Sequence, residues 1–171
     1  THGFDGAFLD HDAIENSGHY GRATKHLKTV DRNTERLAIY RGWMLTVEQY
    51  EKLYNTLLGE HNVRLINDPD QYSLTHSLVR YTSIIPASAL PGTLVIPKKL
   101  LLSSFDKWVE SALSEFSGPV VIKDYVKSEK EYWDTACYIP DPTDLIHAKS
   151  VIKEFLRLRG DSFQGGLVIR E

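Results

Sequence analysis

The residues best suited to bind an anion follow a short β-branched segment. Residues 120–122, Val-Val-Ile, predict a buried strand that delivers Lys123 at its end. Lys127 comes four residues later, and Ser128 and Lys130 follow in an expected loop. A lysine ammonium is a compact, mobile charge that suits a polyphosphate. Lysines at strand ends more often simply reach the solvent, so this segment alone leaves an anion site and a solvated strand end as alternatives.

A second candidate is Arg41, which leaves the predicted strand 37–40 in the segment Arg41-Gly42-Trp43. The carboxyl ends of strands in open α/β sheets face the ligand crevice, so a guanidinium here could clamp an anion with two hydrogen bonds. Gly42 would let the backbone approach a ligand closely. The alternative is an arginine stacked on Trp43 at a surface turn, and the residues alone do not decide between the two.

Other residues with reactive side chains have simpler structural explanations. Cys137 lies among apolar and aromatic residues without a close basic neighbour, which is typical of a buried structural thiol. Asp10, His11 and Asp12 could bind a metal in principle, but no spaced partner cluster supports this, and a solvated strand end is expected. His76 is expected to be a partly buried histidine on a helix. No metal site is therefore predicted.

Motifs and composition exclude several classes of protein. The sequence lacks the glycine-rich motifs of the dinucleotide fold and of the P-loop, and it has neither a nucleophile elbow nor a His-Glu-x-x-His helix. The net charge of −3, from 20 basic and 23 acidic residues, provides no general attraction for nucleic acid. The single cysteine excludes an internal disulfide and fits a reducing compartment, so a cytoplasmic location is expected. No run is apolar enough to span a bilayer, so no membrane partner is expected.

Hydrophobic periodicity predicts alternating strands and helices, which indicates the α/β class. Strands are expected at 6–9, 37–40, 63–66, 93–96, 120–122 and 167–171, and helices at 46–58, 70–81, 104–116 and 142–159. Residues 16–33 are expected to form a long loop, and 133–140 a strand or irregular structure. The succession of elements in residues 37–66 predicts a βαβ unit with parallel strands.

Two local signals define the boundaries of this pattern. Thr46 and Gln49 have the spacing of a capping box at the start of a helix, and Gly59 is expected to stop that helix. Chain-breaking residues, namely Pro86, Pro91 and Gly92, place a domain boundary near residue 90. We therefore expect two domains, residues 1–90 and 91–171.

Four blocks of the sequence are specific in combination, namely 40–45 (Tyr-Arg-Gly-Trp-Met-Leu), 123–128 (Lys-Asp-Tyr-Val-Lys-Ser), 133–137 (Trp-Asp-Thr-Ala-Cys) and 165–171 (Gly-Gly-Leu-Val-Ile-Arg-Glu). Together they resemble the ATP-grasp superfamily, and within it a clade named for one arginine and two lysines. The resemblance covers roughly residues 37–171. It implies a Rossmann-like pre-ATP-grasp domain at 1–90 and the small nucleotide-binding lobe at 91–171.

The resemblance also implies roles for individual residues. Those expected to bind the nucleotide are Lys123, Lys127, Ser128, Arg170 and Glu171, and those expected to act in catalysis are Arg41 and Lys127. The two lysines would contact the ATP phosphates, and Glu171 would lie at the hinge that holds the adenosine. The arginine that gives the clade its name is either Arg41 or Arg170.

The activity that the resemblance implies is that of an ATP-dependent ligase, which joins a small-molecule carboxylate to an amine through an acylphosphate. Such phosphoryl transfer uses ATP with Mg²⁺ and depends on positioning and charge neutralisation. The metal ligands of the superfamily follow the hinge strand, where this chain stops, so the chain as given is expected to lack them. The alternative is a non-catalytic ATP-binding or interaction module.

Overall fold

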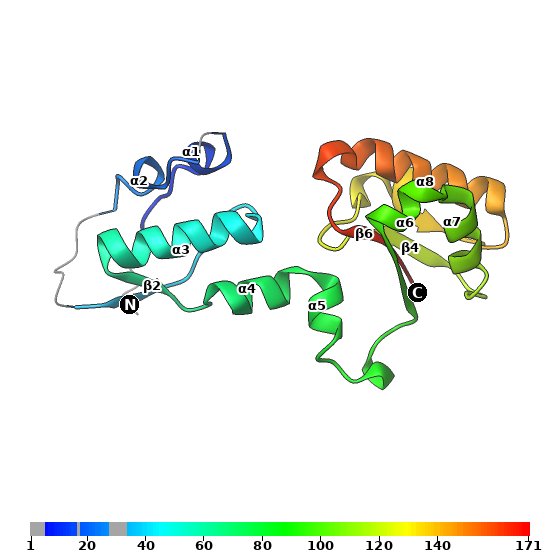
Figure 1. Ribbon diagram of the computed structural model, residues 1–171, viewed down its shortest axis with the longest axis horizontal. Coiled ribbons are helices and arrows are strands. Elements are labelled where there is room, and N and C mark those ends of the chain that lie inside the picture. The colour runs from blue at the N-terminus through cyan, green and yellow to red at the C-terminus, as the bar shows by residue number, and fades with distance from the viewer. Residues whose placement is uncertain (1–5, 17, 28–33) are drawn as a thin grey trace. The chain divides into compact units, whose positions relative to one another are not determined.

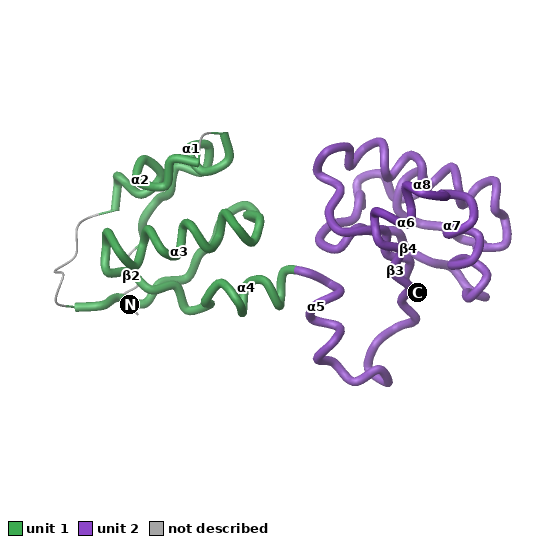
Figure 2. Tube along the Cα trace, in the orientation of Figure 1, with its two compact units in different colours: residues 1–76 green, residues 77–171 purple. Residues whose placement is uncertain are grey.

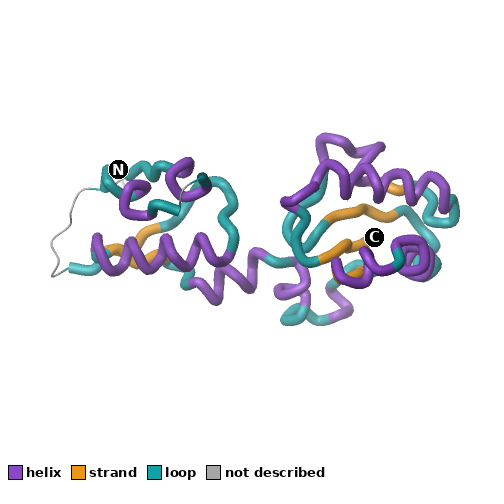
Figure 3. Tube along the Cα trace, turned by 45° about the horizontal axis from the view of Figure 1, so that its top comes forward, coloured by secondary structure: helices purple, strands orange, loops and turns teal. Residues whose placement is uncertain are grey.

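Two compact units, residues 1–76 and 77–171, make up the chain (Figure 2). The computed structural model describes residues 6–16, 18–27 and 34–171. Helices predominate and the strands form two small sheets, so the class is mixed α/β, as the sequence predicts (Figure 3). Residues 77–90 belong to the second unit, which therefore begins earlier than the predicted domain boundary. No helix in the described part of the chain is long and apolar enough to cross a membrane.

Two short parallel strands and one long helix form the centre of the first unit (Figure 1). Its elements are α1 (His11–Glu15), α2 (Tyr20–Ala23), β1 (Arg36–Ala38), α3 (Val47–His61), β2 (Val63–Leu65) and α4 (Pro69–His76). Strands β1 and β2 pair in parallel, with Arg36 beside Val63 and Ala38 beside Leu65. Because α3 connects the two strands, the predicted βαβ unit is confirmed.

Helix α3 begins with the predicted capping box. The backbone N–H of Gln49 donates to the Thr46 hydroxyl at 3.2 Å, and the backbone N–H of Thr46 donates to the Gln49 side chain at 2.9 Å. Gly59, the predicted stop, lies inside the helix, which continues to His61. Asn62 ends it in the left-handed conformation with φ of 53°, a role that asparagine can fill in place of glycine.

The predicted strand at 6–9 is wrong, because residues 6–10 form no strand and α1 follows directly. The Asp10 carboxylate caps this helix by accepting a hydrogen bond from the backbone N–H of Ala13 at 3.1 Å. Ala13 and Ile14 are buried in the same hydrophobic cluster as residues of α3, which favours a helix over a strand. Helix α2 interrupts the predicted loop at 16–33, of which residues 17 and 28–33 lie outside the described residues.

The single helix predicted at 70–81 is also wrong. The chain forms α4 and then α5 (Leu78–Thr82), and Ser77 between them is extended, with φ of −96° and ψ of 123°. The backbone N–H of Leu78 donates to the carbonyl of Tyr125 at 2.7 Å instead of to a helical carbonyl. A tertiary hydrogen bond therefore ends the helical run at the point where the two units divide.

The second unit is a four-stranded antiparallel sheet with helices, in the strand order β3-β6-β4-β5. After α5 its elements are η1 (Ala87–Ala89), β3 (Thr93–Pro97), α6 (Lys98–Ser103), α7 (Phe105–Leu113), β4 (Val120–Lys123), η2 (Lys130–Tyr132), η3 (Trp133–Cys137, a π-helical turn), β5 (Tyr138–Ile139), α8 (Leu145–Arg159), η4 (Gly160–Ser162) and β6 (Gly166–Arg170). The three strands and two helices predicted for this unit are confirmed, with shifts at their ends.

One face of this sheet carries the hydrophobic core. Alternate residues of the strands, namely Ile96, Val120, Ile122, Ile139, Leu167 and Ile169, pack with buried residues of α6, α7 and α8. Ile122 and Ile169 are neighbours across β4 and β6 and are fully buried. Because strand side chains alternate between faces, the residues between these core positions point to the opposite face, called here the open face, on which Lys123 and Arg170 are half-buried and Val168 is fully buried.

Candidate functional site

Lys123 and Arg170 are placed on the open face by the pairing of β4 with β6. Val121 lies opposite Arg170, and Lys123 lies opposite Val168. All four positions alternate with the buried core residues of the same strands, so the two cationic side chains start from one face of the sheet, on adjacent strands. The structure thus brings together two of the residues that the sequence predicts to bind a nucleotide.

Tyr81 of α5 joins these two cations. Its hydroxyl accepts a hydrogen bond from Nη1 of Arg170 at 3.3 Å. Burial lowers the pKa of Lys123; the Tyr81 hydroxyl opposes this effect, and the positive charge of Arg170 adds to it. Within the described residues, no carboxylate forms an ion pair with Lys123 or Arg170. Two neighbouring cations without an ion-pair partner form a site that favours an anion.

The loop after Lys123 is held in shape by the buried carboxylate of Asp124. Its Oδ1 accepts hydrogen bonds from the backbone N–H groups of Val126 at 2.7 Å and of Lys127 at 2.6 Å. The backbone N–H of Asp124 in turn donates to the carbonyl of Lys127 at 2.8 Å. These three bonds close a tight turn that fixes the backbone from which the Lys127 side chain extends.

Arg159, at the end of α8, ties this loop to the following segment. Its guanidinium contacts Oδ2 of Asp124 at 3.0 Å, Oε1 of Glu129 at 3.2 Å and the carbonyl of Ser162 at 2.8 Å. The Asp124 side chain is fully buried and that of Arg159 is 10% exposed. Such a shielded pair is costly to break from one side, because a buried charge is then left without its partner.

Gly165 leaves room for the ring of Tyr125 in the same loop. Its φ of +71° lies in the left-handed region, and a Cβ at this position would collide with the Tyr125 ring. The backbone N–H of Tyr125 also donates to the carbonyl of Gln164, at 3.4 Å. The loop that carries Lys127 is therefore held at Asp124 by hydrogen bonds and at Tyr125 by packing against Gly165.

The other predicted nucleotide-binding residues of this loop lie close to Lys123 in the sequence. Lys127 is exposed and forms no ion pair within the described residues. Ser128 is half-buried. Burial raises the pKa of Cys137, in spite of the opposing effects of the Ser128 side chain and of a contact of 3.8 Å between the thiol and the carbonyl of Ile122. Cys137 is thus the buried structural thiol that the sequence predicts.

Glu171 and Arg41 have different surroundings. The backbone N–H of Glu171 donates to the carbonyl of Gly92 at 3.0 Å, and its carboxylate accepts from the N–H of Gly92 at 3.2 Å. Arg41 is exposed and lies after β1 in the first unit. Beside it, a Cβ on Gly42 would come within 2.5 Å of the Tyr40 hydroxyl, so this glycine makes room for the tyrosine side chain.

The acidic segment at the start of the chain forms a separate group. His11, Asp12 and Glu15 offer ligand atoms within 4.8 Å of one another, while Asp10 is used as the helix cap. The two carboxylates are exposed, and exposed acidic groups often gather without an ion. Within the described residues, Nε2 of His11 is buried without a hydrogen-bond partner, and Nδ1 lies 3.7 Å from the Glu15 carboxylate.

Sequence reasoning missed Tyr81, Asp124 and Arg159. Tyr81 lies in a segment whose pattern predicts an ordinary helix. Asp124 and Arg159 are 35 positions apart, and no spacing rule connects an acid after a strand with a base at a distant helix end. A useful signal is the position of Asp124 itself, because an aspartate directly after a strand is a common turn former.

Comparison with known protein families finds a match that covers residues 111–171. The matching model is that of an ATP-grasp domain, family 3 of the clade named for one arginine and two lysines. The matched segment includes Lys123, Lys127 and Arg170, together with the Asp124–Arg159 pair. No curated protein and no solved structure matches the chain.

Proposed function

Because residues 111–171 match the model of an ATP-grasp domain of the clade named for one arginine and two lysines, we propose that the protein is an ATP-dependent ligase that joins a carboxylate to an amine. The observation that carries the proposal is the pair of cations on the open face, Lys123 and Arg170, which has no carboxylate in an ion pair with it within the described residues. A triphosphate needs such a group of positive charges.

The described residues fit the phosphates of ATP. Lys123 and Arg170 would neutralise phosphate oxygens, and the Tyr81 hydroxyl holds the guanidinium from the side. Lys127 extends from a turn fixed by Asp124 and would supply a third positive charge. Ser128 lies in the same loop as Lys127. Positive charges held in place in this way stabilise the negative charge that develops on the phosphate oxygens during phosphoryl transfer.

The carboxylates next to these cations are not suited to hold Mg²⁺. Asp124 is buried and accepts hydrogen bonds from backbone N–H groups and from Arg159. The Glu171 carboxylate accepts from the backbone of Gly92. A bound Mg²⁺ would neutralise charge on the phosphates, and carboxylates other than these two would have to hold it.

In the proposed reaction an oxygen of the substrate carboxylate attacks the γ-phosphorus of ATP and ADP leaves. The amine nitrogen then attacks the acyl carbon of the acylphosphate, which releases phosphate and a proton. Lys123, Lys127 and Arg170 neutralise charge during the first step. Arg41 remains a proposed catalytic residue as the second candidate for the arginine of the clade, and Glu171 a proposed contact to the adenosine.

The test is ATP binding by the Lys123→Ala variant, measured by calorimetry. We expect at least about tenfold weaker binding, which corresponds to the loss of one charge-assisted contact of about 1.4 kcal/mol. Lys99→Ala is the matched control, since Lys99 is an exposed lysine on α6. Unchanged affinity in Lys123→Ala would contradict the proposal. ATP that binds without release of phosphate or ADP in a mixture of carboxylates and amines would favour the non-catalytic module.

A further inference from the structure

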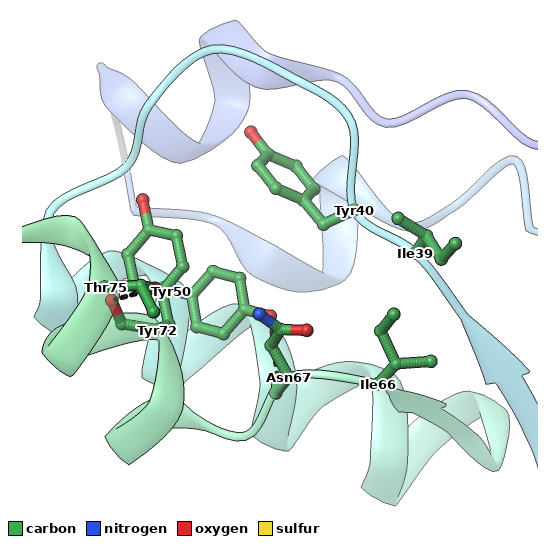
Figure 4. A pocket seen from close by; sticks show the side chains of 7 residues that line it. All are labelled: Ile39, Tyr40, Tyr50, Ile66, Asn67, Tyr72 and Thr75. Carbon is green, nitrogen blue, oxygen red and sulfur yellow. Dashed lines mark hydrogen bonds between the residues drawn. The ribbon is translucent and has the colours of Figure 1, made fainter.

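A pocket of about 280 Å³ lies in the first unit, where β1 and β2 end (Figure 4). It is lined by Ile39, Tyr40, Tyr50, Ile66, Asn67, Tyr72 and Thr75. Figure 4 shows the two isoleucines on one side, aromatic rings on the other and Asn67 between them. Ligand crevices in α/β proteins lie at the carboxyl ends of parallel strands, and β1 and β2 both end at this pocket.

The aromatic wall of the pocket is rigid. The rings of Tyr50 and Tyr72 are stacked, with centroids 3.8 Å apart, and Tyr40 meets Tyr50 edge-on at 6.1 Å. The Tyr40 hydroxyl donates to the backbone carbonyl of Trp43 at 2.7 Å. The hydroxyl of Tyr50 donates to the carbonyl of Asn67, and that of Tyr72 to the carbonyl of Leu45, both at 2.8 Å. A wall whose rotamers are fixed before a ligand arrives loses little entropy on binding.

Charge and size restrict the ligand. Among the described residues, none that lines the pocket is charged, so an ionised group would gain no ion-pair partner from its lining. Burial raises the pKa of Tyr40 and of Tyr50 to about 12, so both hydroxyls stay neutral at physiological pH. A cavity of about 150 Å³ accommodates benzene, so the larger volume here suits a ligand of one or two rings.

Asn67 provides the polar specificity. Its side chain is exposed, and within the described residues no hydrogen bond uses its carboxamide. A carboxamide presents a donor beside an acceptor and can pair with a ring edge that offers the complementary pair. Ile39 and Ile66, which are 61% and 49% exposed, would lose water from their side chains when a flat ring lies against them.

We propose that this pocket binds a neutral heteroaromatic ring that carries a hydrogen-bond donor next to an acceptor, with Asn67 reading that edge, the exposed Ile39 and Ile66 covering one face, and the tyrosine side chains lining the rest of the site. The residues that line the site all belong to the first unit, so the proposed binding is separate from ATP binding by the second. The ring would be part of a small-molecule ligand that extends toward solvent.

Adenine is the probe, and its binding to the full chain is measured by calorimetry and by saturation-transfer NMR. We expect binding to the parent and at least about tenfold weaker binding to Asn67→Asp, because an aspartate keeps the shape and removes the donor. Ile39→Glu should weaken binding similarly by placing a charge at the pocket. Ile146→Glu is the matched control, since Ile146 is 88% exposed on α8, and it should bind as the parent does.

Three results would overturn the proposal: no binding of adenine to the parent, equal affinity in Asn67→Asp, or binding of toluene as tight as that of adenine. Equal affinity in Asn67→Asp would place the adenine elsewhere, including on the second unit. Urea unfolding curves of both variants establish that they fold. If Ile39→Glu unfolds, Asn67→Asp still decides the question, because the tyrosine bond to residue 67 uses its backbone carbonyl.

Discussion

The polar groups around the pocket of the first unit are neutral, namely Asn67, Thr75 and three tyrosines whose hydroxyls donate to backbone carbonyls. The polar groups of the open face and its loop in the second unit are mostly charged. The second unit also uses charge in two ways. Asp124 and Arg159 form a shielded pair, while Lys123 and Arg170 lie on the open face without a carboxylate ion-pair partner in the described residues. The paired charges shape a loop, and the unpaired ones are available to an anion.

This difference predicts that the second unit depends on individual charges far more than the first. Replacing Arg159 by methionine leaves the Asp124 carboxylate buried without its cation, and we expect a loss of about 3–5 kcal/mol in the free energy of unfolding. Urea denaturation measures the loss, and hydrogen exchange should locate it in residues 77–171.

The matched control for this variant is Arg157→Met. Arg157 is an exposed arginine on the same helix, paired with Glu154 three residues away, and its loss should change stability by less than about 1 kcal/mol. If Arg159→Met proves as mild as the control, the Asp124–Arg159 pair does not hold the loop, and the contrast between the two units is not one of buried charge.

The sequence predicts the elements that carry the site but not the contacts that shape it. The β-branched run at 120–122 correctly predicts a strand that ends in Lys123, and the apolar run before Arg170 predicts its partner. Strand alternation then places both side chains on one face once the register is known. The register itself depends on packing across the whole sheet, so local patterns do not determine it.

A long-range polar contact explains the break in the helix predicted at 70–81. The helical pattern of 70–81 runs through Ser77 without a glycine or proline, yet the chain breaks there because Leu78 bonds to the carbonyl of Tyr125. That acceptor lies in a loop whose shape depends on Asp124 and Arg159, which meet only in the folded chain. Tertiary hydrogen bonds of this kind override local propensity and leave no spacing signal.

A smaller effect is expected where the loop is held by backbone shape rather than by charge. In Gly165→Ala the new Cβ collides with the Tyr125 ring and the residue must keep a positive φ, so we expect a loss of about 1–3 kcal/mol. Urea denaturation measures it. The control is Gly118→Ala, where a Cβ meets no atom within 4 Å and stability should change by less than about 1 kcal/mol. Equal effects of the two variants would mean that the Tyr125 contact is not needed.

The smallest effect separates the two units by their response to alkaline pH. The pKa of Tyr50 is raised from 10.0 to about 12, mainly by burial and further by neighbouring tyrosines, so its contribution to stability is complete below about pH 10 and is lost as the pH rises toward 12. The pKa of Lys123 is lowered from 10.5, mainly by burial. As the pH rises, the Lys123 ammonium therefore loses its proton at a lower pH in the native state than in the unfolded state. The contribution of Lys123 to stability rises with pH until about 10.5.

The two substitutions that test this contrast are Tyr50→Phe and Lys123→Met. Relative to the parent, Tyr50→Phe should reduce the loss of stability above about pH 10, and Lys123→Met should remove a gain that occurs below about pH 10.5. Urea unfolding midpoints, measured in steps from about pH 8 to about pH 11, give both slopes. Because each variant is compared with the parent at the same pH, groups that titrate in both proteins cancel. The difference in stability between variant and parent should therefore change with pH in opposite directions for the two substitutions. If both differences change in the same direction, a partner stabilises the charged form of Lys123, and Lys123 is not an unpaired cation on the open face.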